Sequence, residues 1–143
     1  TADLYRVPPE KFRQRAEQYI DLFSIKDYLY DLIESYSHGM RQRLIMAAAL
    51  VHDPEVIIVD EPMVGLDPSA IRIVKKLFTE LAAAGKTIFM STHTLQIAQE
   101  ICDTIAVINK GKIAAHGSYD SLQRETGTTR ADLEDIFLNL TGV

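Results

Sequence analysis

Residues Val56 to Pro62 read "VIIVDEP", and this stretch carries the clearest fold signal in the chain. Its first four residues are apolar and β-branched with no polar alternation, which is the pattern of a central strand covered on both faces. The run ends in Asp60 and Glu61, so two carboxylates follow a buried strand directly. We therefore predict a parallel sheet with a polar rim at the carboxyl end of this strand, where ligands bind in open α/β folds.

The residues that follow alternate between helical and strand patterns. Asp67 can cap a helix that begins at Pro68, and its apolar residues recur at helical spacing as far as Leu81. Gly85 ends that helix, and residues 87–91 form a second buried strand. The later predicted elements are a helix over 95–102, strands over 104–109 and 112–116, and helices over 118–122 and 131–140. Strands separated by helices predict an α/β domain with a largely parallel sheet.

The residues before this stretch are predominantly helical. The apolar spacing predicts a helix over residues 9–23, a second short helix over 27–33, and a buried helix over 40–51 that is rich in Leu and Ala. Ser37 and Gly39 lie just before the third helix, where free backbone N–H groups and the helix dipole attract anions. A simpler role for Ser37 is to cap that helix, and both interpretations stay open here.

Composition restricts the classes of protein that fit. A chain of 143 residues suits one domain or a large part of one, and its formal net charge of −5 argues against a general nucleic-acid binder. Arg41 and Arg43 form the only basic cluster, which we interpret as a solvated helix face. Cys102 has no disulfide partner and is predicted to pack as a small hydrophobe. The longest apolar run, residues 44–51, is far shorter than the ~20 residues needed to cross a bilayer.

The acidic rim suggests phosphate chemistry. Asp60 is suited to hold Mg²⁺ because hard cations prefer carboxylate oxygens, and Glu61 can orient or deprotonate a water nucleophile. His93 follows the next predicted strand, so a parallel sheet would bring it to the same rim, where an imidazole can contact a terminal phosphate. An acidic turn and a purely structural histidine are the simpler alternatives.

A second candidate for a phosphate site does not fit. The tripeptide Gly85-Lys86-Thr87 matches the end of a phosphate-binding loop, but Glu80 occupies the position five residues before Gly85 that requires the first glycine. That loop also runs from strand to helix, whereas this tripeptide runs from helix to strand. We therefore interpret Gly85 as a helix terminator and Lys86 as a favourable charge at the helix end.

In this order, the motifs resemble one family, the ATP-binding cassette (ABC) ATPases of ABC transporters. Residues 37–43 resemble its signature motif, 56–62 its Walker B motif with the following Glu, 65–68 its D-loop and 91–93 its His switch. The ending resembles the tail of ABC-2 type exporter cassettes. The resemblance implies a P-loop NTPase-like α/β fold: a partial, largely parallel sheet flanked by helices, with the end of an α-helical subdomain at the N-terminus.

The resemblance also implies roles for individual residues. Asp60 would hold Mg²⁺, and Glu61 and His93 would be catalytic toward the ATP bound by the same subunit. Ser37 and Gly39 would bind the ATP of a partner subunit.

The same resemblance implies partners. Asp67 would contact a second cassette across a homo- or heterodimer and couple the two ATP sites. A transmembrane permease subunit would be the other partner, no nucleic acid is expected, and the location would be cytoplasmic, at the inner face of the cell membrane. The implied function is an ATP-binding and ATP-hydrolysing transporter subunit, with export favoured by the tail.

The signature departs from the family pattern. Residues 36–40 read Tyr-Ser-His-Gly-Met where the family has Leu-Ser-Gly-Gly-Gln, so Ser37 and the second glycine are kept while the first glycine and the glutamine are lost. His38 adds a Cβ and a ring at a position where the family has a flexible glycine.

The family's Walker A loop, adenine-stacking aromatic and Q-loop all precede the signature, and the sequence begins after them. We therefore expect the C-terminal portion of a cassette: the end of the helical subdomain over 1–54, half of the catalytic core over 55–123, and a helical tail over 124–143. The isolated chain is expected to be inactive, because the backbone donors and lysine that hold the phosphates are missing.

Two alternatives remain at this stage. A truncated cassette could act as a non-catalytic interaction module, because an uncovered sheet edge favours pairing with another chain. A soluble relative of the family that acts in DNA repair or translation is the other alternative, and it is disfavoured by the acidic composition.

Overall fold

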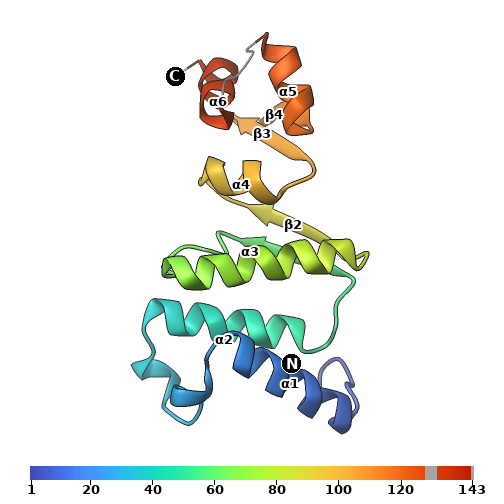
Figure 1. Ribbon diagram of the computed structural model, residues 1–143, viewed down its shortest axis with the longest axis vertical. Coiled ribbons are helices and arrows are strands. Elements are labelled where there is room, and N and C mark those ends of the chain that lie inside the picture. Colours follow the sequence, from blue (N-terminus) through green and yellow to red (C-terminus); the bar gives the residue numbers. More distant parts are fainter. Residues whose placement is uncertain (128–131, 143) are drawn as a thin grey trace. The chain divides into compact units, whose positions relative to one another are not determined.

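The computed structural model describes residues 1–127 and 132–142. Contacts among its residues divide the chain into two compact units, Thr1–Ser91 and Thr92–Val143 (Figure 1). This division falls after the second strand. The predicted subdomain boundaries after residues 54 and 123 concern functional regions, and they stay predictions.

The first unit begins with helices. Helix α1 spans Pro9–Leu22 and packs on α2, which spans His38–Leu50. Both agree with the predicted helices to within about two residues at each end. The predicted helix over 27–33 is wrong: two separate 3₁₀ turns, Lys26–Tyr28 and Ile33–Ser35, occupy this region. Leu32 between them has extended backbone angles, φ −67° and ψ 133°, and an extended residue interrupts any helix.

A parallel strand pair follows in the same unit. Strand β1 spans Val56–Asp60, helix α3 spans Pro68–Ala83 and strand β2 spans Thr87–Ser91. The register places Asp60 opposite Ser91, so the two strands end at the same level. Asp67 caps α3 as predicted, and Gly85 ends the turn after α3 with φ +87°, a left-handed conformation that suits glycine.

The two strands are not covered on both faces as predicted. Ile57 is only 6% exposed, whereas Ile58 is 75% and Phe89 64% exposed, and the last two lie opposite each other in the register. Alternate strand residues point to opposite faces, so one apolar face is buried and the other is open. An apolar run therefore predicted the strand correctly but not what covers it.

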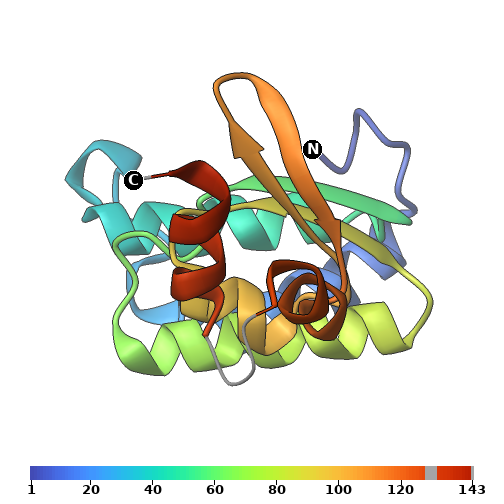
Figure 2. The ribbon, with the colours of Figure 1, turned by 90° about the horizontal axis from the view of Figure 1, so that it is seen from above.

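The second unit combines helices with a hairpin. Its elements are α4 (Leu95–Ile101), β3 (Ile105–Asn109), β4 (Lys112–Gly117), α5 (Tyr119–Thr126) and α6 (Leu133–Thr141). Strands β3 and β4 are antiparallel, and Figure 2 shows their turn reaching beyond α5 and α6. The predicted helix over 118–122 continues further, to Thr126. Ala131, where the last helix was predicted to begin, lies outside the described residues.

The core of this unit is apolar and small. Leu122, Leu133 and Ile136 are at most 1% exposed, and Cys102 at the end of α4 packs against them. Burial raises the pKa of the Cys102 thiol, which agrees with its predicted role as a small hydrophobe. Within residues 1–127 and 132–142, none of the helices has both the length and the apolar character required to span a bilayer.

Candidate functional site

The carboxyl end of the β1–β2 pair carries the first part of the candidate site. Asp60 is the last residue of β1 and Ser91 the last residue of β2. The Ser91 hydroxyl donates a hydrogen bond to Oδ1 of Asp60. Since the two residues are direct neighbours in the parallel register, the strand pairing itself brings them together.

Glu61 follows β1 directly and has an unusual backbone. Its φ is +46°, in the left-handed region that non-glycine residues rarely adopt, and such strain is concentrated at functional sites. Its N–H donates to the carbonyl oxygen of Ser91 at 3.0 Å, so the inter-strand hydrogen bonding continues one residue past β1. The left-handed conformation begins the turn that leads to the buried Pro62.

The donors at this edge fit a magnesium ion. Mg²⁺ is commonly held by one or two carboxylates together with water and substrate phosphates rather than by a cage of protein ligands. Asp60 is exposed and supplies hard oxygen atoms. Among the described residues, no group of three or more His, Cys, Asp or Glu side chains forms a metal cage. The chemistry of Asp60 therefore suits a cation that is shared with phosphates.

His93 belongs to the second unit, two residues after the end of β2. It lies in a short turn in which the Thr94 N–H donates to the Thr92 side-chain oxygen at 3.0 Å. Asp60 and Glu61 belong to the first unit. The predicted meeting of His93 with the two carboxylates stays a prediction.

The signature region forms a capped turn. Ser37 Oγ accepts a hydrogen bond from the Met40 N–H at 3.2 Å, so Ser37 caps α2. A Cβ at Gly39 would lie 2.9 Å from the carbonyl oxygen of Gly65, which is too close for any other residue without a shift. Gly39 therefore permits the α2 N-terminus to approach the loop that follows β1.

Asp67 closes that loop with both of its oxygens. Oδ1 accepts from the N–H groups of Ser69 and Ala70, each at 3.0 Å, and Oδ2 pairs with the Arg43 guanidinium. The hydrogen bond from the Ser69 hydroxyl, followed by that from the Ala70 N–H, lowers the pKa of Asp67 to about 2, and the Arg43 charge acts in the same direction.

The solvated-face interpretation of Arg41 and Arg43 is therefore half right. Arg41 is exposed, but the Arg43 side chain is only 22% exposed and holds Asp67. Gln42 also donates to the carbonyl oxygen of Pro62 at 3.2 Å. The first turns of α2 thus hold the loop over residues 62–67 at both of its ends.

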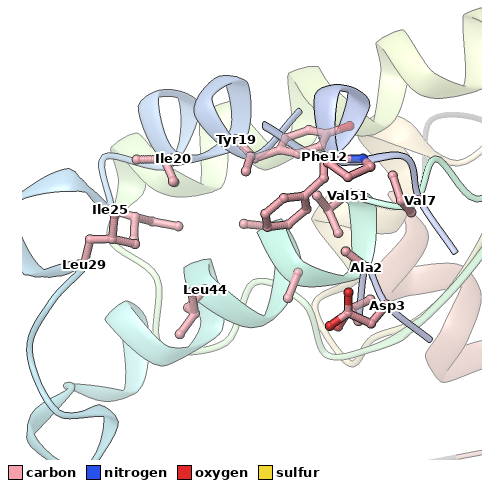
Figure 3. Close-up of a pocket in the computed structure, with 15 residues that line it drawn as sticks. Ala2, Asp3, Val7, Phe12, Tyr19, Ile20, Ile25, Leu29, Leu44 and Val51 are labelled. Atoms are coloured by element: carbon pink, nitrogen blue, oxygen red, sulfur yellow. The ribbon is translucent and has the colours of Figure 1, made fainter. Parts of the chain in front are cut away.

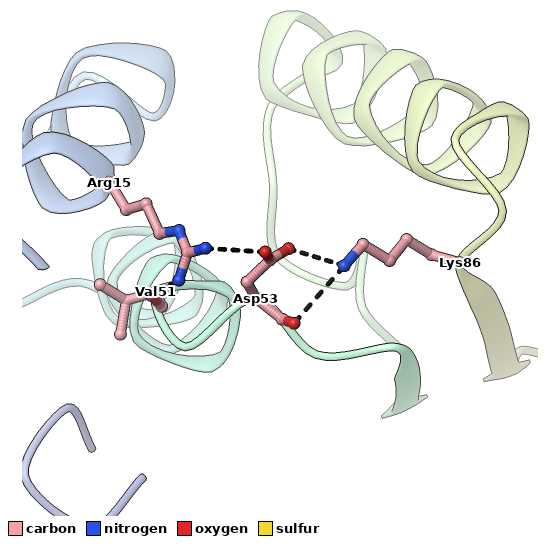
Figure 4. Close-up of polar contacts among 4 residues, drawn as sticks. All are labelled: Arg15, Val51, Asp53 and Lys86. Carbon is pink, nitrogen blue, oxygen red and sulfur yellow. Dashed lines mark hydrogen bonds and ion pairs between the residues drawn. The ribbon is translucent and has the colours of Figure 1, made fainter. Parts of the chain in front are cut away.

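The opposite end of the strand pair has an ion-pair network. Figure 4 shows Asp53 between two cations: Arg15 lies 2.7 Å from Oδ2 and Lys86 lies 2.6 Å from Oδ1. Arg15 also donates to the carbonyl oxygen of Val51 at 3.3 Å. Lys86 therefore has a structural partner within the chain. This agrees with the interpretation of Gly85-Lys86-Thr87 as a helix end rather than a phosphate site.

A cavity of about 430 Å³ lies between α1, α2 and the N-terminal segment (Figure 3). Apolar side chains such as Phe12, Tyr19 and Ile25 line most of it, and among the described lining residues Asp3 carries the charged side chain. None of the six predicted site residues lines this cavity. The candidate chemistry is therefore associated with the strand ends and not with this hollow.

Sequence reasoning missed two polar partners. Ser91 and Arg43 were recognised only as members of motifs, and their contacts with Asp60 and Asp67 span 31 and 24 residues of sequence. A signal for Ser91 was present, because Asp60 and Ser91 stand equally far along the sequence from Val56 and Thr87, the residues at which the two strands begin. No comparable local pattern connects Arg43 with Asp67.

Comparison with known proteins places these motifs in a family. The family model described as "ABC transporter" matches residues 3–64. A solved structure described as an ATP binding subunit of an ABC transporter superimposes with a TM-score of 0.92 at 29% identity, over 97% of this chain and 58% of that one. The chain belongs to the ABC transporter family.

Curated ABC transporter proteins agree with this assignment. An uncharacterized ABC transporter ATP-binding protein of Nostoc sp. is 42% identical over 85% of this chain and 37% of its own length. The daunorubicin resistance ATP-binding protein DrrA3 of Streptomyces coeruleorubidus is 35% identical over 91% of this chain and 41% of its own. The ABC transporter ATP-binding protein NatA of Bacillus subtilis is 32% identical over 95% of this chain and 54% of its own length.

The chain thus spans roughly two fifths to half of the length of these ABC transporter relatives. The matching structure confirms the predicted P-loop NTPase-like α/β fold class. The matched residues 3–64 include the turn at Ser37 and Gly39 and the two carboxylates at the end of β1, Asp60 and Glu61.

Proposed function

We propose that this chain forms part of the ATP site of an ABC transporter subunit that hydrolyses ATP to drive transport. The observation that carries the proposal is the placement of Asp60 and Glu61 at the carboxyl end of a parallel strand. There the Ser91 hydroxyl donates to the Asp60 carboxylate, and the Ser91 carbonyl oxygen accepts the Glu61 backbone N–H. Ligands bind at this edge in open α/β sheets, and phosphoryl transfer requires positioned carboxylates for the metal and for the nucleophilic water.

The carboxylates at the strand end would have separate tasks. Asp60 would hold Mg²⁺ between the chain and the phosphates, and the ion when bound would neutralise negative charge that develops during transfer. Glu61 would accept a hydrogen bond from the attacking water and orient it toward the terminal phosphate. His93 would donate a hydrogen bond to that phosphate.

The signature turn would serve a second cassette's nucleotide. Ser37 and Gly39 lie at the N-terminus of α2, and the free N–H groups of a helix N-terminus favour phosphate oxygens. Asp67 would act at the same dimer interface. Because its oxygens already bond Arg43 and the start of α3, it would act through the position of the 62–67 loop or by exchanging one of these partners.

The remaining partner in this proposal is a transmembrane permease subunit, which would place the chain at the cytoplasmic face of a membrane. Export is the favoured direction. Two relatives are named for drug resistance or export: daunorubicin resistance DrrA3 and a fluoroquinolones export ATP-binding protein of Mycobacterium tuberculosis.

The test is Mg²⁺-dependent ATP hydrolysis by the complete subunit, comparing wild type with Glu61→Gln. We expect the substitution to lower turnover about 100-fold or more while nucleotide binding persists, because an amide cannot accept the proton or polarise water as a carboxylate does. Glu55→Gln, an exposed change just before β1, is the matched control and should hydrolyse ATP like wild type. Equal turnover in wild type and Glu61→Gln would refute the assignment.

A further inference from the structure

We propose that Ser91 is a positioning residue for the metal-binding carboxylate of Asp60. The inference rests on the proposed function, since it concerns the same ATP site. Ser91 ends β2 directly opposite Asp60, and its hydroxyl donates to Oδ1 of that residue. Neither the motif nor the fold assigns Ser91 this task.

The Ser91 hydroxyl fixes the orientation of the Asp60 carboxylate. A carboxylate at a strand end can rotate about its terminal bond, which is a broad and roughly two-fold torsion. The bond from Ser91 to Oδ1 restricts that rotation, so the other oxygen is presented in one direction for a cation. Groups that hold a metal ligand in this way commonly change metal affinity by about 10- to 100-fold when removed.

The main chain of Ser91 holds the backbone of Glu61, the residue that follows Asp60. Its carbonyl oxygen accepts the Glu61 N–H at 3.0 Å, immediately where Glu61 adopts a φ of +46°. One residue therefore holds the side chain of Asp60 and the backbone of Glu61. A substitution at position 91 removes only the first of these bonds, because the carbonyl remains.

The best substitutions are Thr and Val, which have nearly the same shape and differ in the hydroxyl. Both are favoured in strands, and Ser91 is exposed, so neither requires a change in packing. Any difference between Ser91→Thr and Ser91→Val therefore reports on the hydrogen bond to Asp60. Thr79→Val removes a hydroxyl that bonds the Lys75 carbonyl within α3, and it serves as a control distant in the sequence.

The experiment uses the complete subunit with a non-hydrolysable ATP analogue, and Mn²⁺ binding is followed by electron paramagnetic resonance. We expect Ser91→Val to raise the Mn²⁺ dissociation constant about tenfold, and Ser91→Thr and Thr79→Val to stay within about twofold of wild type. The Mg²⁺ concentration that half-saturates ATP hydrolysis should rise in parallel for Ser91→Val. Melting temperatures of all variants are measured, and Ser91→Ala repeats the test if valine lowers the melting temperature.

The outcomes separate this inference from the proposed function. If wild type binds Mn²⁺ with nucleotide and Ser91→Val and Ser91→Ala bind it equally well, the role of Ser91 is overturned and the ATP site stands. If wild type binds no Mn²⁺ with nucleotide, both proposals fall.

Discussion

The two ends of the β1–β2 pair treat negative charge differently. At the amino end, the carboxylate of Asp53 contacts two cations of the same chain, Arg15 and Lys86. At the carboxyl end, the Asp60 carboxylate accepts a hydrogen bond from a neutral partner, the Ser91 hydroxyl, and the Ser91 carbonyl oxygen accepts the backbone N–H of the next residue, Glu61. Each end contains one non-glycine residue with positive φ, Asp53 at +59° and Glu61 at +46°. Similar local geometry thus accompanies internal ion pairing at one end and the proposed ligand site at the other.

The ion pairs at the amino end change the pKa of Asp53. The hydrogen bond from Lys86 lowers the pKa of the Asp53 carboxyl, burial opposes this, and the Arg15 charge lowers the pKa further. A lowered pKa means that the charged form stabilises the fold, and this contribution is lost as the pH falls through the folded-state pKa. Asp53 is about half exposed, so we expect a modest contribution from each pair.

The sharpest comparison makes one chemical change at both ends. Asp60→Asn in the complete subunit should lower Mg²⁺-dependent ATP hydrolysis about 100-fold or more, since an amide is a poor ligand for a hard cation. Its melting temperature should not fall. Asp53→Asn should keep wild-type turnover and lose about 0.5–1 kcal/mol of unfolding free energy with the ion pairs, while asparagine tolerates the positive φ.

Turnover and urea denaturation of both variants test this division. The proposed difference between the two ends is contradicted if Asp53→Asn impairs hydrolysis at saturating Mg²⁺ as strongly as Asp60→Asn does. It is also contradicted if Asp60→Asn is the less stable of the two variants.

Two glycines extend the comparison to the turns at each end. Gly65, in the loop after β1, and Gly85, in the turn before β2, have φ of +77° and +87°. A Cβ at Gly85 would meet nothing within 4 Å, whereas a Cβ at Gly65 would lie 2.2 Å from Cδ2 of His38. We expect Gly85→Ala to cost about 1–2 kcal/mol from backbone strain alone, and Gly65→Ala to cost more.

The stability cost of Gly65→Ala beyond that of Gly85→Ala should depend on His38. Removing its ring in the double variant Gly65→Ala with His38→Gly should bring the cost of Gly65→Ala, measured in the His38→Gly background, down to that of Gly85→Ala. Equal costs for the two single variants would show that the His38 ring moves aside freely, and the close contact would then have no energetic weight.

Local rules predicted much of this structure. The caps at Ser37 and Asp67, the helix end at Gly85 and the strand before Asp60 each follow from a few neighbouring residues. The position of the carboxylate pair, Asp60 and Glu61, was also predictable, because it depends on the strand that directly precedes the pair.

Contacts between distant segments were not predictable in the same way. The partners of Asp60 and Asp67 are separated from them by 31 and 24 residues, and only strand register and helix packing bring them together. The covered face predicted for β1 failed for a related reason. Apolar residues such as Ile58 indicate a surface suited to burial, but not which segment covers it.

The smallest expected effect concerns pH and Asp67. Its folded-state pKa of about 2 lies below the ordinary value of 3.8, so its charge stabilises the fold above about pH 4, and this contribution is lost as the pH falls from about 4 to 2. Asp67→Asn keeps a side-chain oxygen for the N–H groups of α3 but removes the charge that pairs with Arg43. Denaturation of both proteins between pH 2 and 6 should show a stability difference that is constant above about pH 4 and shrinks below it. A difference that does not change with pH would mean that the Asp67 charge contributes nothing and that its capping oxygen alone holds the loop.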